Sequence, residues 1–289
     1  MMTTYKASKK FEIAKTNTKA ELGFSKKELE KKLEKSRKKL GELQNALYAH
    51  GKHAVLVCLQ GMDTAGKNSL IREVFKDFNS SGIAVHSFKV PSTREKNQDY
   101  LWRHYLVLPQ KGTFGVFNRT HYENVLVTKV HPEYILNENI PGISKIEAID
   151  ENFWKQRYRQ INDFERHLSE NGTLILKFFL HISKEEQKYR LLRRLKRPEK
   201  NWKFSPADLA ERKLWKAYQS AYQEAIKNTS TDYAPWYVIP SDSKPEARLL
   251  VCETLRKVLK NHTPSHPPQL DAETMKNLGT YIKHLEQEK

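Results

Sequence analysis

Short apolar runs alternate with longer charged segments along this chain of 289 residues. Because strands that alternate with helices usually form one parallel sheet between two helical layers, this pattern favours a three-layer α/β fold. The chain is long enough for one large domain of this kind. Five runs have the length and composition of buried strands, and they lie at 54–59, 83–90, 113–117, 173–182 and 236–239.

Ser-x-x-acid signatures mark the expected helix starts, since a serine side chain can cap the backbone N–H groups that a first helical turn leaves free. Ser25 with Glu28 opens the first and most charged helix, which is expected over 25–49. We interpret its lysines as a solvated face, because its apolar stripe consists of Leu29, Leu33, Leu40, Leu43 and Leu47. Four further helices are expected to start at Ser144, Ser183, Ser205 and Ser243.

These elements divide the chain into three parts. Residues 1–50 are expected to form an extended arm and the first helix, and residues 51–262 the main domain. Residues 263–289 open with Thr-Pro-Ser-His-Pro-Pro, which breaks the chain because proline cannot continue a helix. They finish in a polar helix, which is expected to pack on the body of the domain or on another subunit.

The composition narrows the class of partner. Lys and Arg outnumber Asp and Glu by 51 to 34, a net charge of +17 that favours a polyanion such as a nucleic acid, an anionic membrane or a phosphorylated substrate. No apolar stretch has the length of a membrane span or of a signal-peptide core. With only Cys58 and Cys252, neither a disulfide framework nor a zinc site is indicated, and we expect a cytoplasmic protein.

A phosphate-binding loop follows the first predicted strand. Its sequence, GMDTAGKN, has the GxxxxGK spacing and precedes a helix-like segment. Glycines let backbone N–H groups converge on an anion, the next helix offers its positive N-terminal end, and the lysine reaches further phosphates. The expected phosphate contacts are Gly61, Met62, Thr64, Ala65, Gly66, Lys67, Asn68 and Ser69.

This loop departs from the usual motif in how it would hold a metal ion. The hydroxyl residue that normally follows the lysine and ligates Mg²⁺ is replaced by Asn68, whose neutral amide is a weaker ligand than a carboxylate. Asp63 inside the loop is therefore the candidate metal residue, with Mg²⁺ the expected ion and Mn²⁺ an alternative. The competing interpretation is that Asp63 only caps the turn.

Further candidates follow the other strands, because ligands in parallel α/β sheets bind at the carboxyl ends of strands. Asn118 occupies the position where a carboxylate usually ends the third strand, and the nearest carboxylate is Glu123. Arg119 is expected to contact phosphate, unless it only pairs with a helix acid. We expect His121 to pack or hydrogen-bond rather than act as a base.

Two basic groups complete the candidate site. Lys89, Thr93 and Arg103 follow the second strand and are expected to contact an anionic acceptor. Arg190 and Arg194 lie four residues apart on one face of a helix and are expected to clamp a phosphate chain. The alternative for this row is a solvated helix face.

With these residues assembled, the chain closely resembles the polyphosphate kinase 2 family over residues 25 to 262. The resemblance rests on GMDTAGK and on three longer stretches, FNRTHYENVLV at 117–127, DYLWRHYLVLP at 99–109 and EEQKYRLLRRLKRPEKNWKF at 185–204. It implies Mg²⁺-dependent, reversible phosphoryl transfer between inorganic polyphosphate and a nucleotide. It also implies a P-loop kinase fold like that of thymidylate kinase, with a helical lid and an N-terminal helical extension, in a homo-oligomer that is often a tetramer.

The resemblance also suggests the acceptor. Some members carry Asp at position 118 and Asn at 123, whereas Asn118 with Glu123 resembles the subgroup that phosphorylates both AMP and ADP, giving ADP and ATP. GMP and GDP are further expected acceptors. In this interpretation Lys67 holds phosphates, Asp63 organises Mg²⁺ and Glu123 helps to select the nucleotide. The transferring group would be neutralised by Arg119, Arg190 and Arg194.

Two alternatives remain open from the sequence. The first is an ATP-dependent nucleotide or nucleoside kinase in which the basic charge is incidental. The second is a P-loop protein that binds nucleic acid, although the chain has no array of alternating basic and aromatic residues and no helicase-type motif. We therefore expect neither a nucleic acid nor a membrane as partner.

Overall fold

A five-stranded parallel sheet forms the centre of the protein in a computed structural model that describes residues 5–8, 10–264, 266 and 268–288. The strands run in the order β2-β3-β1-β4-β5, and every neighbouring pair is parallel. The interior strands β1 and β4 are almost wholly apolar and buried, as their continuous hydrophobic runs require. The strands are β1 (Ala54–Gln60), β2 (Ile83–Ser87), β3 (Phe114–Asn118), β4 (Thr173–His181) and β5 (Trp236–Pro240).

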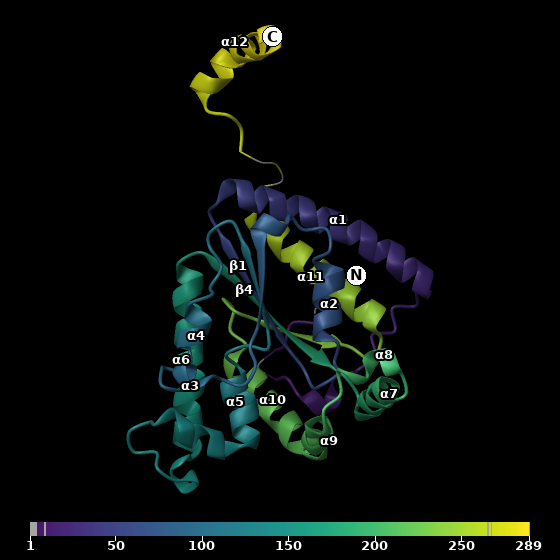
Figure 1. Ribbon diagram of the computed structural model, residues 1–289, viewed down its shortest axis with the longest axis vertical. Helices are drawn as coiled ribbons and strands as arrows, with labels where there is room; N and C mark the ends of the chain where they lie inside the picture. The colour runs from purple at the N-terminus through teal and green to yellow at the C-terminus, as the bar shows by residue number, and fades with distance from the viewer. Residues whose placement is uncertain (1–4, 9, 265, 267, 289) are drawn as a thin grey trace.

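Helices cover both faces of this sheet (Figure 1). One layer consists of α1 (Lys26–His50), α2 (Lys67–Val74) and α11 (Lys244–His262), and α11 contacts both of the others. The other contains α5 (Glu123–Val130), α6 (Glu151–Glu170) and α10 (Trp215–Thr229). The structure therefore has the predicted three layers. The remaining helices are α3 (Thr93–Lys96), α4 (Trp102–Tyr105), α7 (Lys184–Leu195), α8 (Pro198–Asn201), α9 (Pro206–Lys213) and α12 (Ala272–Gln287), with short 3-10 turns at 13–15, 80–82, 132–138 and 146–148.

Most of the expected helix starts are confirmed. Ser25 and Glu28 form the full capping box of α1, and the side chains of Ser183 and Ser205 accept N–H bonds at the starts of α7 and α9. Ser243 precedes α11, but its side chain makes no capping bond. The prediction of a helix that starts at Ser144 is wrong.

A stronger cap six residues later displaces the start expected at Ser144. The Asp150 carboxylate accepts the backbone N–H of Phe153 at 2.9 Å, and α6 begins at Glu151. Only a single 3-10 turn forms upstream, at Ile146–Ala148. A carboxylate at the cap also interacts favourably with the positive end of the helix, which a serine hydroxyl cannot match.

The second strand is shorter than its apolar run. β2 ends at Ser87, because Val90 precedes Pro91, which has no N–H to continue a ladder. The backbone of 88–90 instead leaves the sheet at the edge where β3 also ends. The third strand extends one residue beyond the expectation, to Asn118, whose carbonyl accepts the Phe88 N–H at 3.1 Å.

The N-terminal arm is extended, as expected, and its described residues are fixed to the sheet. The Ala7 N–H donates to the Trp236 carbonyl, and the Val238 N–H donates to the Tyr5 carbonyl, both at 2.8 Å. The arm thus pairs antiparallel with β5 and covers the open edge of that strand.

The C-terminal helix α12 differs from its expected character. It exposes a row of large apolar side chains, so the description of this segment as polar was wrong. Among the described residues, no helix is both long enough and apolar enough to cross a membrane.

Candidate active site

The phosphate-binding loop connects β1 to α2 at the carboxyl edge of the sheet. Gly66 has φ +111°, and a Cβ at Gly61 would lie 2.9 Å from the Leu180 carbonyl oxygen, so both turns depend on glycine. Thr64 also has a left-handed backbone, with φ +67°. The side chains of Met62 and Ala65 are buried in the core. These two residues therefore offer a phosphate only their backbone groups.

Lys67 begins α2 and curls back over the loop. Its Nζ donates to the Gly61 carbonyl at 2.6 Å. Burial, reinforced by the charge of Arg119, lowers the pKa of this ammonium to about 8 against the opposing effect of Asp63 and Glu123. A bound phosphate would bring negative charge close to Lys67 and so favour its protonated form. The charge of Lys67 is therefore coupled to occupation of the site.

We expect kcat/KM for polyphosphate to fall as the pH rises through about 8, because Lys67 loses its charge above its lowered pKa. The effect on the free energy of unfolding has the opposite sign. Between pH about 8 and pH 10.5, the ordinary pKa of lysine, the unfolded chain keeps a proton that Lys67 in the folded protein has released. Stability therefore rises with pH in this range. A pH profile of kcat/KM tests this. Since arginine stays charged, Lys67→Arg should remove the fall.

Lys244 lines the same cleft, and burial together with Arg190 lowers its pKa to about 8 as well. The Lys67→Arg variant therefore also tells which lysine is responsible. A fall that persists in Lys67→Arg would contradict the assignment to Lys67.

Arg119 lies between two carboxylates at the mouth of the loop. Its Nη2 is 3.1 Å from Asp63 Oδ1, and its Nη1 is 3.4 Å from Glu123 Oε2. Its backbone is left-handed, with φ +61°, an uncommon conformation for a residue with a side chain. The side chain is 43% exposed and lines the cleft. Arg119 can therefore pair with the helix residue Glu123 and still be accessible to a phosphate.

Oxygen atoms of Asp63 and of the same cleft lining are of the kind that a hard cation prefers. The described residues hold no cluster of three or more His, Cys, Asp or Glu arranged for a metal, so an ion here would keep waters and phosphate oxygens as ligands. Two buried oxygens of the cleft, Thr64 Oγ1 and Asn118 Oδ1, have no hydrogen-bond partner in the described part of the chain. The Asn118 amide nitrogen donates to Asn68 Oδ1 at 2.8 Å and to Ser87 Oγ at 3.0 Å. This donor set fits Mg²⁺ or Mn²⁺ bound through one carboxylate.

Arg190 does not fit the phosphate contact that the sequence predicted. Its guanidinium is buried and all five of its N–H groups have acceptors in the protein. Nη1 donates to the Thr64 and Ala65 carbonyls, both at 2.9 Å, Nη2 to the Ser241 and Asp242 carbonyls, and Nε to Glu186. Arg190 therefore fastens α7 to the phosphate-binding loop and to the segment after β5.

Arg194 lies one turn further along α7 and does face the cleft. Its Nη1 contacts Asp208 Oδ2 at 3.2 Å and the Lys203 carbonyl at 3.3 Å. Both partners belong to the segment that contains α8 and α9. This segment and the end of α7 together correspond to the predicted helical lid.

The loop opens into one large basic cleft of about 870 Å³. It is lined by two acidic residues, Asp63 and Asp208, and by eleven basic ones: Lys67, Arg72, Lys89, Arg119, Arg190, Arg193, Arg194, Lys200, Lys203, Lys244 and Arg248. Much of the +17 charge is therefore concentrated around the phosphate-binding loop. A compact polyanion is the class of ligand that this lining suits.

Sequence reasoning missed Lys244 and Arg248, which lie four apart at the start of α11. The usable signal was their place directly after the fifth strand, at the same edge of the sheet as the loop. The sequence also predicted that Thr93 and Arg103 contact the acceptor together with Lys89, but of these three only Lys89 lines the cleft. Arg103 instead donates to the Lys89 carbonyl at 2.9 Å and supports that loop from behind.

Comparison with known proteins now decides the family. The profile of the family "Polyphosphate kinase 2 (PPK2)" matches residues 23–267. The chain belongs to the polyphosphate kinase 2 family. This confirms the resemblance found in the sequence.

Relatives of this family member are similar along most of their length. The chain is 47% identical over 230 residues to the AMP/ADP-polyphosphate phosphotransferase of Meiothermus ruber, covering 80% of each chain. It is 44% identical over 259 residues to the ADP-polyphosphate phosphotransferase of Rhodopseudomonas palustris, covering 89% of each. The crystal structure of polyphosphate kinase 2 from Arthrobacter aurescens TC1 superimposes with a TM-score of 0.85 at 35% identity, covering 96% of this chain and 95% of that one. The predicted fold is thereby confirmed.

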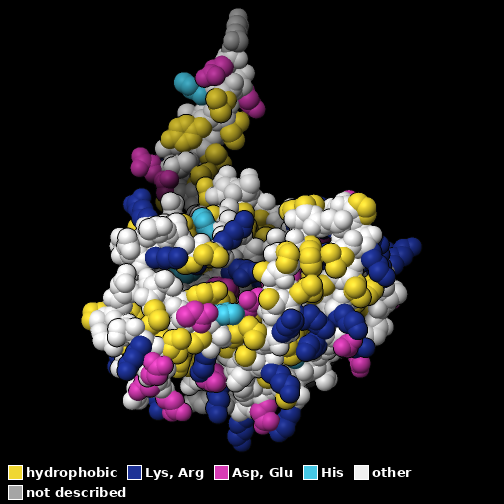
Figure 2. Space-filling model, turned by 60° about the horizontal axis from the view of Figure 1, so that its bottom comes forward, with side chains coloured by type: hydrophobic (Ala, Val, Ile, Leu, Met, Phe, Trp, Pro, Cys, Tyr) yellow, Lys and Arg dark blue, Asp and Glu magenta, His cyan; other side chains and the backbone are white. Residues whose placement is uncertain are grey.

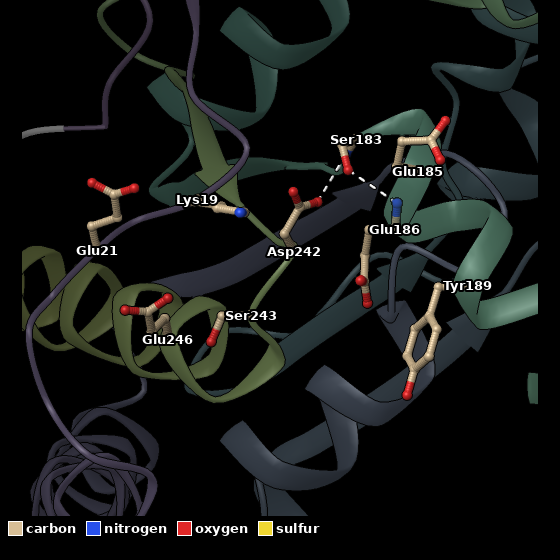
Figure 3. Close-up of a pocket in the computed structure, with 9 residues that line it drawn as sticks. All are labelled: Lys19, Glu21, Ser183, Glu185, Glu186, Tyr189, Asp242, Ser243 and Glu246. Atoms are coloured by element: carbon tan, nitrogen blue, oxygen red, sulfur yellow. Dashed lines mark hydrogen bonds between the residues drawn. The ribbon is translucent and has the colours of Figure 1, made fainter.

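A second pocket of this polyphosphate kinase 2 family member, of about 610 Å³, is acidic (Figure 3). Asp242 accepts the Ser183 N–H and the Thr18 hydroxyl, both at 2.8 Å, and Glu246 accepts the Leu22 N–H at 2.9 Å. These carboxylates anchor the N-terminal arm to the segments that follow β4 and β5. Their charge makes this pocket unsuitable for a polyanion.

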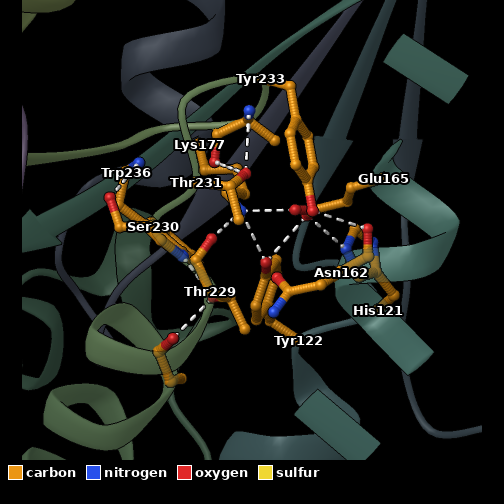
Figure 4. Close-up of polar contacts among 12 residues, drawn as sticks. His121, Tyr122, Asn162, Glu165, Lys177, Thr229, Ser230, Thr231, Tyr233 and Trp236 are labelled. Carbon is orange, nitrogen blue, oxygen red and sulfur yellow. Dashed lines mark hydrogen bonds and ion pairs between the residues drawn. The ribbon is translucent and has the colours of Figure 1, made fainter. Parts of the chain in front are cut away.

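Behind the Asn118–Glu123 turn lies a buried charged network (Figure 4). Lys177 Nζ donates to Glu165 Oε2 at 2.5 Å, and the Tyr122 hydroxyl and His121 Nε2 contact Glu165 Oε1 at 2.8 and 3.1 Å. Burial opposes ionisation of Glu165, but Lys177 and His121 outweigh it and hold its pKa below the ordinary value. His121 therefore packs and hydrogen-bonds, as predicted. The turn presents Arg119 to the cleft while this network holds its inner side.

Proposed function

We propose that this protein transfers the terminal phosphoryl group of inorganic polyphosphate to AMP and ADP, giving ADP and ATP, reversibly and with Mg²⁺. The observation that carries the proposal is the large basic cleft around the phosphate-binding loop. A polyphosphate chain is a dense row of negative charges without bases, and eleven cationic side chains in one cleft suit it. The activities that the names of the two similar relatives describe support the same assignment.

The topology suggests which end of the cleft takes which substrate. Strands β3 and β2 lie on one side of β1, and their ends contribute Asn118 and Lys89 together with Phe88 and Val90. Strands β4 and β5 lie on the other side and lead into α7 and α11, which contribute Arg193, Lys244 and Arg248. We place the nucleotide at the β2–β3 end, where polar and apolar groups mix, and the polyphosphate at the purely basic end.

The reaction then needs positioning and charge neutralisation more than acid–base chemistry. A phosphate oxygen of the nucleotide attacks the terminal phosphorus of polyphosphate, and the P–O bond to the chain breaks. The chain leaves one phosphate shorter and keeps the bonding electron pair. Lys67 and the loop amides hold the phosphates, and Arg119 and Arg194 neutralise the transferring group.

Asp63 would hold Mg²⁺, which when bound supplies further neutralisation of phosphate charge. Glu123 would influence the acceptor through Arg119, which it contacts directly. GMP and GDP are further proposed acceptors.

A product time course from AMP and polyphosphate, without ATP, tests this function. ADP should appear first and ATP later, because the ADP formed is the second acceptor. If ADP accumulated and no ATP formed, the activity would be limited to nucleoside monophosphate acceptors. If ADP formed only when ATP replaced polyphosphate as donor, the protein would be an ATP-dependent nucleotide kinase and the proposal would be wrong.

A further inference from the structure

Two strongly exposed apolar side chains line the basic cleft. Val90 is 85% exposed and Trp202 is 77% exposed, and they are the two most exposed large apolar residues in the described part of the chain. Both belong to the lining around the phosphate-binding loop. The other exposed large apolar side chains lie outside this cleft, several of them on α12, which projects from the body (Figures 1 and 2). A polyphosphate chain has no apolar part, so the donor does not explain this pair.

Trp202 lies directly after α8, in the segment that corresponds to the predicted lid. Lys203 Nζ lies 4.7 Å from the centroid of the indole ring of Trp202. The Lys203 carbonyl accepts a hydrogen bond from Arg194 Nη1 at 3.3 Å. The backbone beside Trp202 is therefore joined to the part of α7 that faces the cleft.

Val90 comes from a different segment, the turn that follows β2. The Phe88 N–H donates to the Asn118 carbonyl at 3.1 Å, and Arg103 Nη1 donates to the Lys89 carbonyl at 2.9 Å. The backbone that leads to Val90 is thus fixed by hydrogen bonds, although its side chain lies in solvent. A fixed turn that exposes an apolar side chain in a cleft favours contact with a ligand.

The surroundings of this pair indicate the chemistry of the ligand. Lys89 precedes Val90, while Lys200 and Lys203 lie close to Trp202 in the sequence, and all three lysines line the same cleft. A membrane or an apolar peptide needs a continuous apolar surface, which two side chains among cations do not provide. The ligand must instead join a small, flat apolar group to an anionic one. A nucleoside phosphate has both, because its base stacks on aromatic side chains and its phosphates bind cations.

We propose that Trp202 and Val90 bind the base of the acceptor nucleotide, the indole by stacking and the valine by contact of its methyl groups. This inference rests on the proposed function, in which AMP and ADP are the acceptors. It makes Trp202 a residue that selects an acceptor with a base over one without. Stacking involves no hydrogen bond to the base, so adenine and guanine are both accepted.

Calorimetric titration of the full-length protein with AMP, and with ribose 5-phosphate as the same ligand without its base, tests this contact. Trp202→Ala should raise the Kd of AMP by about 5- to 100-fold, the usual effect of removing one aromatic side chain that stacks on a base. It should leave the Kd of ribose 5-phosphate unchanged. Trp202→Phe keeps an aromatic ring and should retain most of the affinity for AMP. Leu209→Ala removes a 45% exposed apolar side chain of the same lid outside the cleft, so this control should keep the parent Kd.

Two results would overturn the proposal. One is an unchanged Kd of AMP in Trp202→Ala, and the other is an equal loss of affinity for AMP and ribose 5-phosphate, because Trp202 would then act on the sugar phosphate and not on the base. Val90→Ala should weaken AMP binding less than Trp202→Ala, since it removes only two methyl groups. The titration involves no turnover. If AMP bound through Trp202 but polyphosphate did not act as donor, the proposed function would fail and this base contact would stand.

Discussion

Lys67→Ala is expected to lower kcat with polyphosphate by about 10²–10³-fold, the usual effect of removing one preorganised group that stabilises charge in a transition state. Lys67 is the cation fixed at the start of α2 directly behind the phosphate-binding loop, and its Nζ lies 2.6 Å from the Gly61 carbonyl. Steady-state rates at saturating AMP and polyphosphate measure the effect.

The same substitution should leave the fold intact. Burial already disfavours the charged form of Lys67, so its removal takes away an unfavourable term rather than a stabilising one. Thermal unfolding measured beside the rates separates loss of chemistry from loss of structure. Lys76→Ala, an exposed lysine close after α2, is the matched control and should keep the parent activity. Full activity in Lys67→Ala would remove this lysine from the site.

Lys177→Met is expected to destabilise the protein by about 3–5 kcal/mol, because it leaves the carboxylate of Glu165 buried without its cation. Both side chains are fully buried, and Lys177 also donates to the Thr229 carbonyl at 2.7 Å. Urea unfolding monitored by circular dichroism gives the free energy directly.

The double variant Lys177→Met with Glu165→Leu distinguishes an unpaired charge from lost packing. It should be more stable than Lys177→Met alone, since no charge is then left buried. If the two substitutions instead added their separate costs, the ion pair would not be the source of the effect. Because the same network holds the turn that carries Arg119, the double variant should also lose activity.

The sheet and the loop could be predicted from the sequence because their signals are local. Buried strands such as β1 and β4 are continuous apolar runs, and GxxxxGK with its strand and helix fixes the loop. The errors arose where two local signals competed. Asp150 outcompetes Ser144 as a cap, and Pro91 ends a strand that the apolar pattern would continue.

The role of Arg190 could not be predicted, because it depends on contacts across the fold. Its carbonyl acceptors lie 51 to 126 residues away in sequence, and nothing in its own segment distinguishes it from Arg194. Lys244 and Arg248 differ, because their place directly after the fifth strand was a usable signal, but the strand order that brings them to the loop is not local. They join the cleft only because β5 ends beside β4 at the edge where the loop lies.

The five hydrogen bonds of Arg190 also determine where the cleft can hinge. They join the middle of α7 to the Thr64 and Ala65 carbonyls, so this part of the helix moves with the phosphate-binding loop as one rigid unit. If the predicted lid closes over a substrate, we therefore expect the chain to bend after Arg190. The moving element is then expected to begin near Arg194 and to carry α8 and α9, while the first two turns of α7 stay fixed as its base.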